Sequence, residues 1–340
     1  MSAELDVTDY EENANDDSMT PEEVATQIAK GGEEVIVKWH NAILKEPPTF
    51  DAFLEQVNTM KNRYPNVILY DRTRVKLVGA KLGDDYYHAS YVDSYDRPDR
   101  YILAQAPFDE ATESDFWRLI VQTGAKLIVL LTDLNNREGC RIIKHFWPES
   151  NATARSYPEA NIKVNCTMSD ATALYDWYKF SISHVVDKRV AVITVTMLHY
   201  RRWIYDKIIP DNLLEFRSEV DGSHSFHSSL FIFIENLSEA TIVKWESRIA
   251  RSDCTGPICL LCPTGVHRSG TYVTLDIVLD RVTVEKKVGL LETASIVRKQ
   301  RYGCMSHYSH YSHVADLVVQ YAVATGIVDA GRVNRKGRKV

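Results

Sequence analysis

The chain has 340 residues, of which 45% are hydrophobic and 25% charged, which is typical of a soluble globular protein with one substantial core. Its formal net charge of -6 argues against nucleic acid as the main partner. None of the six cysteines falls in a paired zinc spacing, no signal peptide is evident, and the apolar runs are too short to span a bilayer. We therefore expect a cytoplasmic protein in a reducing environment.

The two ends of the chain are predicted to be tails around one domain. Residues 1–20 contain seven acids and no Lys or Arg, so we expect a disordered acidic tail. Residues 329–340 are rich in Lys and Arg and are predicted to form a basic tail. A solvated tail is favoured, and a weak contact with anionic lipid at the inner plasma membrane is the alternative. Residues 21–328 form one predicted domain, since no Pro-, Gly- or Ser-rich linker interrupts them.

Helix-like and strand-like segments alternate between the tails. The first predicted helix covers residues 20–44, where Thr20 and Glu23 fit a capping box and Pro21 takes the first helical position. The spacing of apolar residues predicts further helices at 113–124, 240–250, 271–282 and 291–301, and runs of β-branched residues predict strands at 126–132, 189–198 and 256–262. This pattern predicts an α/β fold with a buried, mixed sheet.

A predicted strand, a short loop and a predicted helix meet at the sequence LLCPTGVHRSG, residues 260–270. The backbone N–H groups of such a loop converge, and the helix N-terminus adds a positive partial charge, which suits an anion. Cys262 ends the strand, and Arg268 returns from the far side with a planar fork that matches two phosphate oxygens. A thiolate in that field is a good nucleophile, and Ser269 could donate a hydrogen bond to the sulfur. A buried structural cysteine is the alternative interpretation.

Motifs along residues 30–325 resemble those of the protein tyrosine phosphatases, in family order. They read KNRYPNVILYDRTRV from Lys61, DDYYHASYV from Asp84, RYILAQAP from Arg100, FWP from Phe146, LHYRRW from Leu198 and VRKQRYGCM from Val297. The chain resembles a divergent, non-receptor member, similar to the many short nematode members. The resemblance implies a single α/β domain with a highly twisted mixed sheet flanked by helices, and a phosphate loop between a strand and a helix.

The resemblance also implies roles for individual residues. Cys262 would be the nucleophile that forms a phosphocysteine, Arg268 the phosphate clamp, and an aspartate the acid that protonates the leaving phenol. Tyr64 would line a deep slot that selects phosphotyrosine. The residues implied to surround the substrate are Pro263, Thr264, Gly265, Val266, His267 and Ser269. The family chemistry requires no metal or cofactor, and the implied partner is a phosphotyrosine-containing protein.

Three substitutions inside the loop depart from the family pattern. The histidine before the cysteine is replaced by Leu261, so the sulfur loses a group that favours its thiolate form. Pro263 stands in place of serine and has no N–H to offer a phosphate. His267 stands in place of a glycine and adds bulk where the backbone passes close to the phosphate.

The predicted acid segment, WIYDKIIP at residues 203–210, is one residue longer than the family's W-P-D-x-G-V-P. Tyr205 therefore takes the place of the aspartate, and Asp206 follows one step later. A displacement of ~1 Å already costs up to ~100-fold in rate. A surface position is therefore favoured for Asp206, and a bulged segment that returns it to the site as the acid is the alternative.

The segment that carries two glutamines in the family has neither here. Alignment from Arg301 puts Ser306 and His310 in their places, and an imidazole at His310 could still orient water. His307, His310 and His313 recur every three residues, which could suggest a metal site on one helix face. No carboxylate or cysteine ligand accompanies them in the sequence, so we predict no metal.

Three functions stay open at this stage. The favoured one is a signalling regulator that binds phosphotyrosine proteins with absent or strongly reduced turnover, a pseudophosphatase, because losing a general acid typically costs 10²–10⁴-fold. The second is an active but slow phosphatase that uses Cys262, Arg268 and a displaced Asp206. The third is a non-binding scaffold on the same fold, in which Pro263 and His267 occlude the loop.

Overall fold

The computed structural model describes residues 19–42, 49–78, 84–150, 152–186, 188–224 and 256–329. Their strands form one nine-stranded sheet in the order β1-β2-β3-β9-β4-β8-β7-β6-β5. Four strands at its centre run parallel to one another: β3 (Tyr101–Gln105), β9 (Ile258–Cys262), β4 (Leu127–Leu130) and β8 (Arg189–His199). The predicted α/β fold with a mixed sheet is confirmed.

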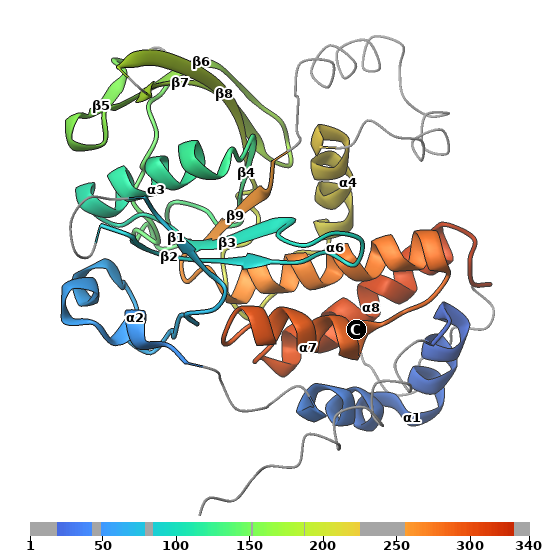
Figure 1. Ribbon diagram of the computed structural model, residues 1–340. Coiled ribbons are helices and arrows are strands. Elements are labelled where there is room, and N and C mark those ends of the chain that lie inside the picture. The colour runs from blue at the N-terminus through green and yellow to red at the C-terminus, as the bar shows by residue number, and fades with distance from the viewer. Residues whose placement is uncertain are drawn as a thin grey trace, which may run out of the picture.

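Antiparallel strands extend this centre on both sides. β2 (Tyr86–Val92) and β1 (Arg74–Lys76) continue the sheet from β3. From β8 it continues through β7 (Asp176–Val186), β6 (Ile162–Ala171) and β5 (Arg155–Tyr157). The long strands β6, β7 and β8 curve over α3 (Glu110–Thr123), as Figure 1 shows.

Helices cover both faces of the sheet. Opposite α3 lie α4 (Leu213–His224), α6 (His267–Glu285), α7 (Leu290–Gln300) and α8 (Tyr308–Ala324) (Figure 1). The remaining helices of the described residues are α1 (Pro21–Ala42), which packs against α8, the short α2 (Asp51–Leu54), and two 3-10 turns at Gln56–Lys61 and Pro158–Ala160. The helix predicted at 240–250 and most of both predicted tails lie outside the described residues.

The sequence of β9 explains how the cysteine is aimed. Successive side chains of a strand point to opposite faces of the sheet. Ile258, Leu260 and Cys262 pack with the helices α4, α6, α7 and α8, whereas Cys259 and Leu261 pack with α3 on the other face. Both faces are buried, which is why this central parallel strand is apolar throughout.

The first helix begins as predicted but is not straight. The amide of Glu23 donates to Thr20 Oγ1 at 3.3 Å, and the amide of Thr20 donates to Glu23 Oε2 at 2.7 Å, which is the predicted capping box. Gly32, with φ +57°, interrupts the helical backbone inside α1 and produces a kink that the apolar periodicity did not indicate.

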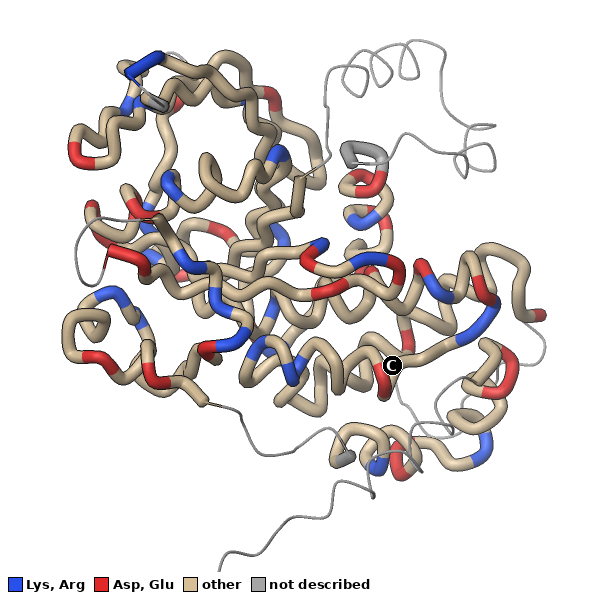
Figure 2. The backbone as a smooth tube through the Cα atoms, viewed as in Figure 1, with Lys and Arg blue, Asp and Glu red and all other residues tan. Residues whose placement is uncertain are grey.

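Charge is mixed over the surface. Basic and acidic residues are interspersed along the described backbone rather than separated into faces of one sign (Figure 2). Among the described residues, no helix combines the length and the apolar character needed to cross a membrane.

Candidate phosphate-binding site

The phosphate loop is short and tightly packed. Cys262 ends β9 and is fully buried, and α6 begins at His267, so four residues form the connection. Gly265 turns the chain with φ +65° and donates its amide to the Cys262 carbonyl at 3.2 Å. A Cβ at Gly265 would lie 2.4 Å from the carbonyl carbon of Ala104 in β3. The turn therefore requires glycine, both for its left-handed backbone and for its contact with the sheet.

Arg301 holds this loop from the side of α7 and is fully buried. Its Nε donates to the Gly265 carbonyl at 3.0 Å, and its Nη2 donates to His88 Nδ1 at 2.8 Å. Nδ1 can accept because the other ring nitrogen of His88 donates to the Val67 carbonyl at 2.8 Å. Burial lowers the pKa of His88 to about 3 and that of Arg301 to about 10. Nothing near Arg301 in the sequence indicates that it supports the phosphate loop in this way.

Arg268 is 3% exposed, and both of its terminal nitrogens donate to the protein's own oxygens. Its Nη1 donates to the Leu131 carbonyl at 3.3 Å and to the Thr132 hydroxyl, and its Nη2 donates to the Ile204 carbonyl at 3.1 Å. The last contact ties the guanidinium to the acid segment. Arg268 therefore holds residues 203–210 over the loop.

The loop amides are also engaged. The Thr264 hydroxyl accepts from the amide of Val266 at 3.2 Å and from the amide of His267 at 3.4 Å. Its Oγ1 lies 3.7 Å from the Cys262 sulfur. The Ser269 hydroxyl is buried and has no hydrogen-bond partner within the described part of the chain. Its predicted hydrogen bond to the Cys262 sulfur therefore stays a prediction.

Asp206 lies at this loop with its side chain 37% exposed, as in the bulged arrangement given as the alternative, and its role as the acid stays a prediction. Trp203 and Ile209 are buried in the core and anchor the two ends of the segment. The extra residue is absorbed between them by a turn, in which the Ile208 amide donates to the Tyr205 carbonyl at 3.2 Å. Tyr205 points outward and is 44% exposed, with the Arg137 guanidinium 5.5 Å from its ring centroid. The bulge thus turns Tyr205 out and Asp206 in.

Both the carboxylate and the backbone of Asp206 are fixed. Oδ2 accepts from His267 Nδ1 at 2.5 Å, and Oδ1 lies 3.4 Å from Arg268 Nε. The Asp206 carbonyl accepts from His310 Nε2 at 2.5 Å, and His310 Nδ1 accepts from the Thr271 hydroxyl at 2.9 Å. Burial by itself would raise the pKa of Asp206, but the hydrogen bond and charge of His267, together with Arg268, hold it below its usual value. Asp206 is therefore ionised at neutral pH.

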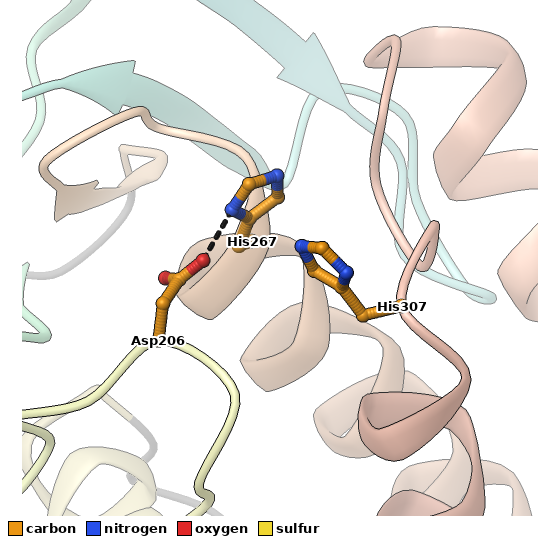
Figure 3. A group of neighbouring side chains, drawn as sticks. All are labelled: Asp206, His267 and His307. Atoms are coloured by element: carbon orange, nitrogen blue, oxygen red, sulfur yellow. Dashed lines mark hydrogen bonds and ion pairs between the residues drawn. The ribbon is translucent and has the colours of Figure 1, made fainter.

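Histidines from two helices surround this aspartate. His267 opens α6, His307 is the N-cap of α8, and their ring centroids are 4.6 Å apart. Figure 3 shows both rings on the same side of Asp206. His310 is buried in the first turn of α8, and burial lowers its pKa to about 4, so its imidazole is neutral. The sequence predicts His310 at this site but indicates no role there for His307.

Tyr64 lies near the loop, and its role in a phosphotyrosine slot stays a prediction. Gln105 pairs with Cys262 in the sheet; its side chain accepts from the Arg63 amide at 3.0 Å and donates to the Lys61 carbonyl at 2.9 Å, which fixes the segment before Tyr64. Burial raises the pKa of Tyr64, and the charges of Arg63 and Arg268 oppose that rise.

Comparison with known proteins agrees with this arrangement. Residues 58–320 match the family model described as protein-tyrosine phosphatase. The chain belongs to the protein tyrosine phosphatase family. It is 30% identical over 261 residues to receptor-type tyrosine-protein phosphatase alpha of Homo sapiens, an alignment that covers 74% of this chain and 28% of the relative.

Two further relatives show the same pattern. Receptor-type tyrosine-protein phosphatase zeta of Rattus norvegicus is 29% identical over 282 residues, covering 80% of this chain and 11% of the relative. Tyrosine-protein phosphatase Lar-like of Caenorhabditis elegans is 27% identical over 277 residues, covering 79% and 11%. The chain thus corresponds to less than a third of the length of these curated relatives.

A cavity of about 470 Å³ opens near this site but does not include the loop. Its walls carry three cations, Arg63, Arg141 and Lys144, together with the acids Asp109 and Glu110. Because Arg63 precedes Tyr64 in the chain, this cavity lies beside the wall of the predicted phosphotyrosine slot.

Proposed function

We propose that this protein tyrosine phosphatase domain binds phosphotyrosine-containing proteins with absent or strongly reduced hydrolysis. The observation that carries the proposal is the ion pair of Asp206. A general acid must bring a proton to the leaving phenol. Asp206 instead accepts from His267 and faces the Arg268 guanidinium, and both neighbours favour the ionised carboxylate.

The groups that would bind the phosphate are retained. Cys262 ends β9, Arg268 lies in the first turn of α6, and Tyr64 lies near both. The bonds from Arg268 to neutral carbonyls are 3.1–3.3 Å long. A phosphate dianion accepts more strongly than a carbonyl. A phosphate that replaces these carbonyls would therefore gain stronger hydrogen bonds from Arg268, which supports the proposed binding of phosphotyrosine.

The groups that would release the phosphate are altered. Leu261 packs in the apolar core on the face of β9 opposite Cys262, and its side chain has no polar atom to act on the sulfur. His310 stands in place of a glutamine, and both its ring nitrogens are occupied by Asp206 and Thr271. Hydrolysis of a phosphocysteine needs a positioned water. The apolar Leu261 cannot hold one, and His310 has no free ring nitrogen to do so.

Two alternative functions each have one observation in their favour. An active but slow phosphatase is favoured by the bulge that returns Asp206 to the loop. A non-binding scaffold is favoured by the protein's own groups: the Ile204 carbonyl engages Arg268, and the Thr264 hydroxyl engages two loop amides. A cytoplasmic location, and contact of the basic residues beyond 330 with the inner plasma membrane, stay predictions, since those residues lie outside the described part.

Binding and turnover of a phosphotyrosine peptide, measured together, test the proposal. We expect wild type to prefer the phosphorylated peptide over the unphosphorylated one, and Cys262→Ser to retain that preference. Arg268→Lys should weaken binding by about tenfold or more, because a lysine cannot replace a two-pronged contact. Equal affinity for both peptides would support the scaffold. Phosphate release within about tenfold of an active relative's rate, abolished by Cys262→Ser, would support the enzyme.

A further inference from the structure

Three metal-ligating side chains from distant parts of the sequence meet above the phosphate loop. Asp206 comes from the acid segment, His267 from the first residue of α6, and His307 from the N-cap of α8 (Figure 3). Each offers one ligand atom, and these atoms all lie within 4.8 Å of one another. Two histidines and one carboxylate are a ligand set that suits zinc.

The distances are close to those that a metal ion requires. Zinc bonds to nitrogen and oxygen are about 2.0–2.2 Å, so the ligand atoms of a tetrahedral site lie about 3.3 Å apart. The Asp206–His267 pair is 2.5 Å apart, joined by a hydrogen bond that an ion would replace. Opening this pair by about 0.8 Å and closing on His307 by at most about 1.5 Å would complete the set. Rotation of side chains supplies movements of that size.

The residues around Asp206, His267 and His307 leave these three ligands accessible to an ion from solvent. The side chains of His267 and Asp206 are 23% and 37% exposed, so an ion can reach them. His310 fixes the Asp206 carbonyl, which orients the carboxylate without using it. Arg268 opposes a cation, but its Nε faces Oδ1, whereas His267 faces Oδ2, the oxygen that an ion would take.

We infer that Asp206, His267 and His307 bind a single Zn²⁺ ion over the phosphate loop. The ion would join the acid segment to α6 and α8 and would leave Oδ2 of Asp206 unable to carry a proton. This site differs from the His307, His310 and His313 set that the sequence spacing suggests, because only His307 is shared. It does not depend on whether the phosphatase turns over.

Metal binding by the full chain, measured without peptide, tests the inference. The protein is stripped with chelator and titrated with Zn²⁺ by calorimetry, and with Co²⁺ to report ligand type by absorption. We expect one zinc-binding site that survives in Cys262→Ser, and a Co²⁺ spectrum without a thiolate charge-transfer band. His307→Ala should weaken zinc binding by about tenfold or more, since even a group that only orients a ligand contributes 10–100-fold.

His313→Ala is the matched control, because it removes a histidine from the same helix and the same sequence repeat. Its zinc affinity should equal that of wild type, and thermal unfolding without metal should show that both variants fold. The inference is overturned if wild type binds no zinc, if Cys262→Ser abolishes binding, or if His313→Ala weakens binding as much as His307→Ala does.

Discussion

Replacing Gly265 by alanine is a direct test of how the phosphate loop is built. The substitution adds one methyl group to Gly265. The Gly265 amide donates to the Cys262 carbonyl, and the Gly265 carbonyl accepts from Arg301. Two separate penalties are expected. The φ of +65° is a left-handed conformation, which costs a residue with a side chain about 1–2 kcal/mol. The added Cβ would also lie 2.4 Å from backbone atoms of Ala104 and Gln105, far inside contact distance.

The contact penalty can be measured apart from the backbone penalty. Overpacking against atoms that cannot easily move typically costs about 1–3 kcal/mol, so Gly265→Ala should destabilise the chain by about 2–5 kcal/mol. Gly139 is the matched control, since its φ is +79° and an added Cβ would meet nothing within 4 Å. Gly139→Ala should therefore carry only the backbone penalty of about 1–2 kcal/mol.

Urea unfolding of the two variants and wild type, followed by fluorescence, gives both free-energy differences. Gly265→Ala should lose about 1–3 kcal/mol more than Gly139→Ala, and its phosphopeptide binding should fall because the loop can no longer lie against β3. Equal destabilisation by the two substitutions would refute the claim that contact with the sheet sets the shape of this loop.

Two further predictions concern the histidines His88 and His267. The pKa of His88 is about 3 in the folded chain and about 6.5 when unfolded, so the unfolded chain takes up the proton first as pH falls below about 6.5, and the stability of the fold decreases. The loss of unfolding free energy from His88 amounts to about 2 kcal/mol at pH 5. His88→Asn should remove that part of the difference in unfolding free energy between pH 7 and pH 5. An unchanged difference would contradict the low pKa of His88. His267→Gly removes the partner of the Asp206 carboxylate, an interaction of about 1 kcal/mol for a partly exposed pair. Phosphate release should rise severalfold; a rate that stays the same or falls would show that His267 does not restrain the acid.

Much of the fold could be predicted because its signals are local. The apolar runs at β4, β8 and β9 and the helical spacing in α3, α6 and α7 each lie within one short stretch of sequence. The same holds for the Cys262–Arg268 spacing, which strand, loop and helix place around one point. Local patterns therefore gave both the architecture and the position of the phosphate loop.

The position of Asp206 could not be obtained this way. In the sequence alignment Asp206 lies one position after the place of the family's aspartate. In the structure, burial of Trp203 and Ile209 fixes the ends of the segment, and the turn between them decides which side chain faces inward. His307 is 40 positions from His267, so only the packing of α8 against α6 brings the two rings together. Tertiary packing, rather than sequence spacing, determines both.

The rate of phosphate release from a bound phosphotyrosine peptide tests the central claim most directly. It is measured by rapid quench at saturating enzyme, beside the catalytic domain of receptor-type tyrosine-protein phosphatase alpha under the same conditions. We predict binding of the peptide with release slower than that of the relative by about 10²–10⁴-fold, the usual consequence of a missing general acid. Release within about tenfold of the relative, abolished by Cys262→Ser, would contradict the account.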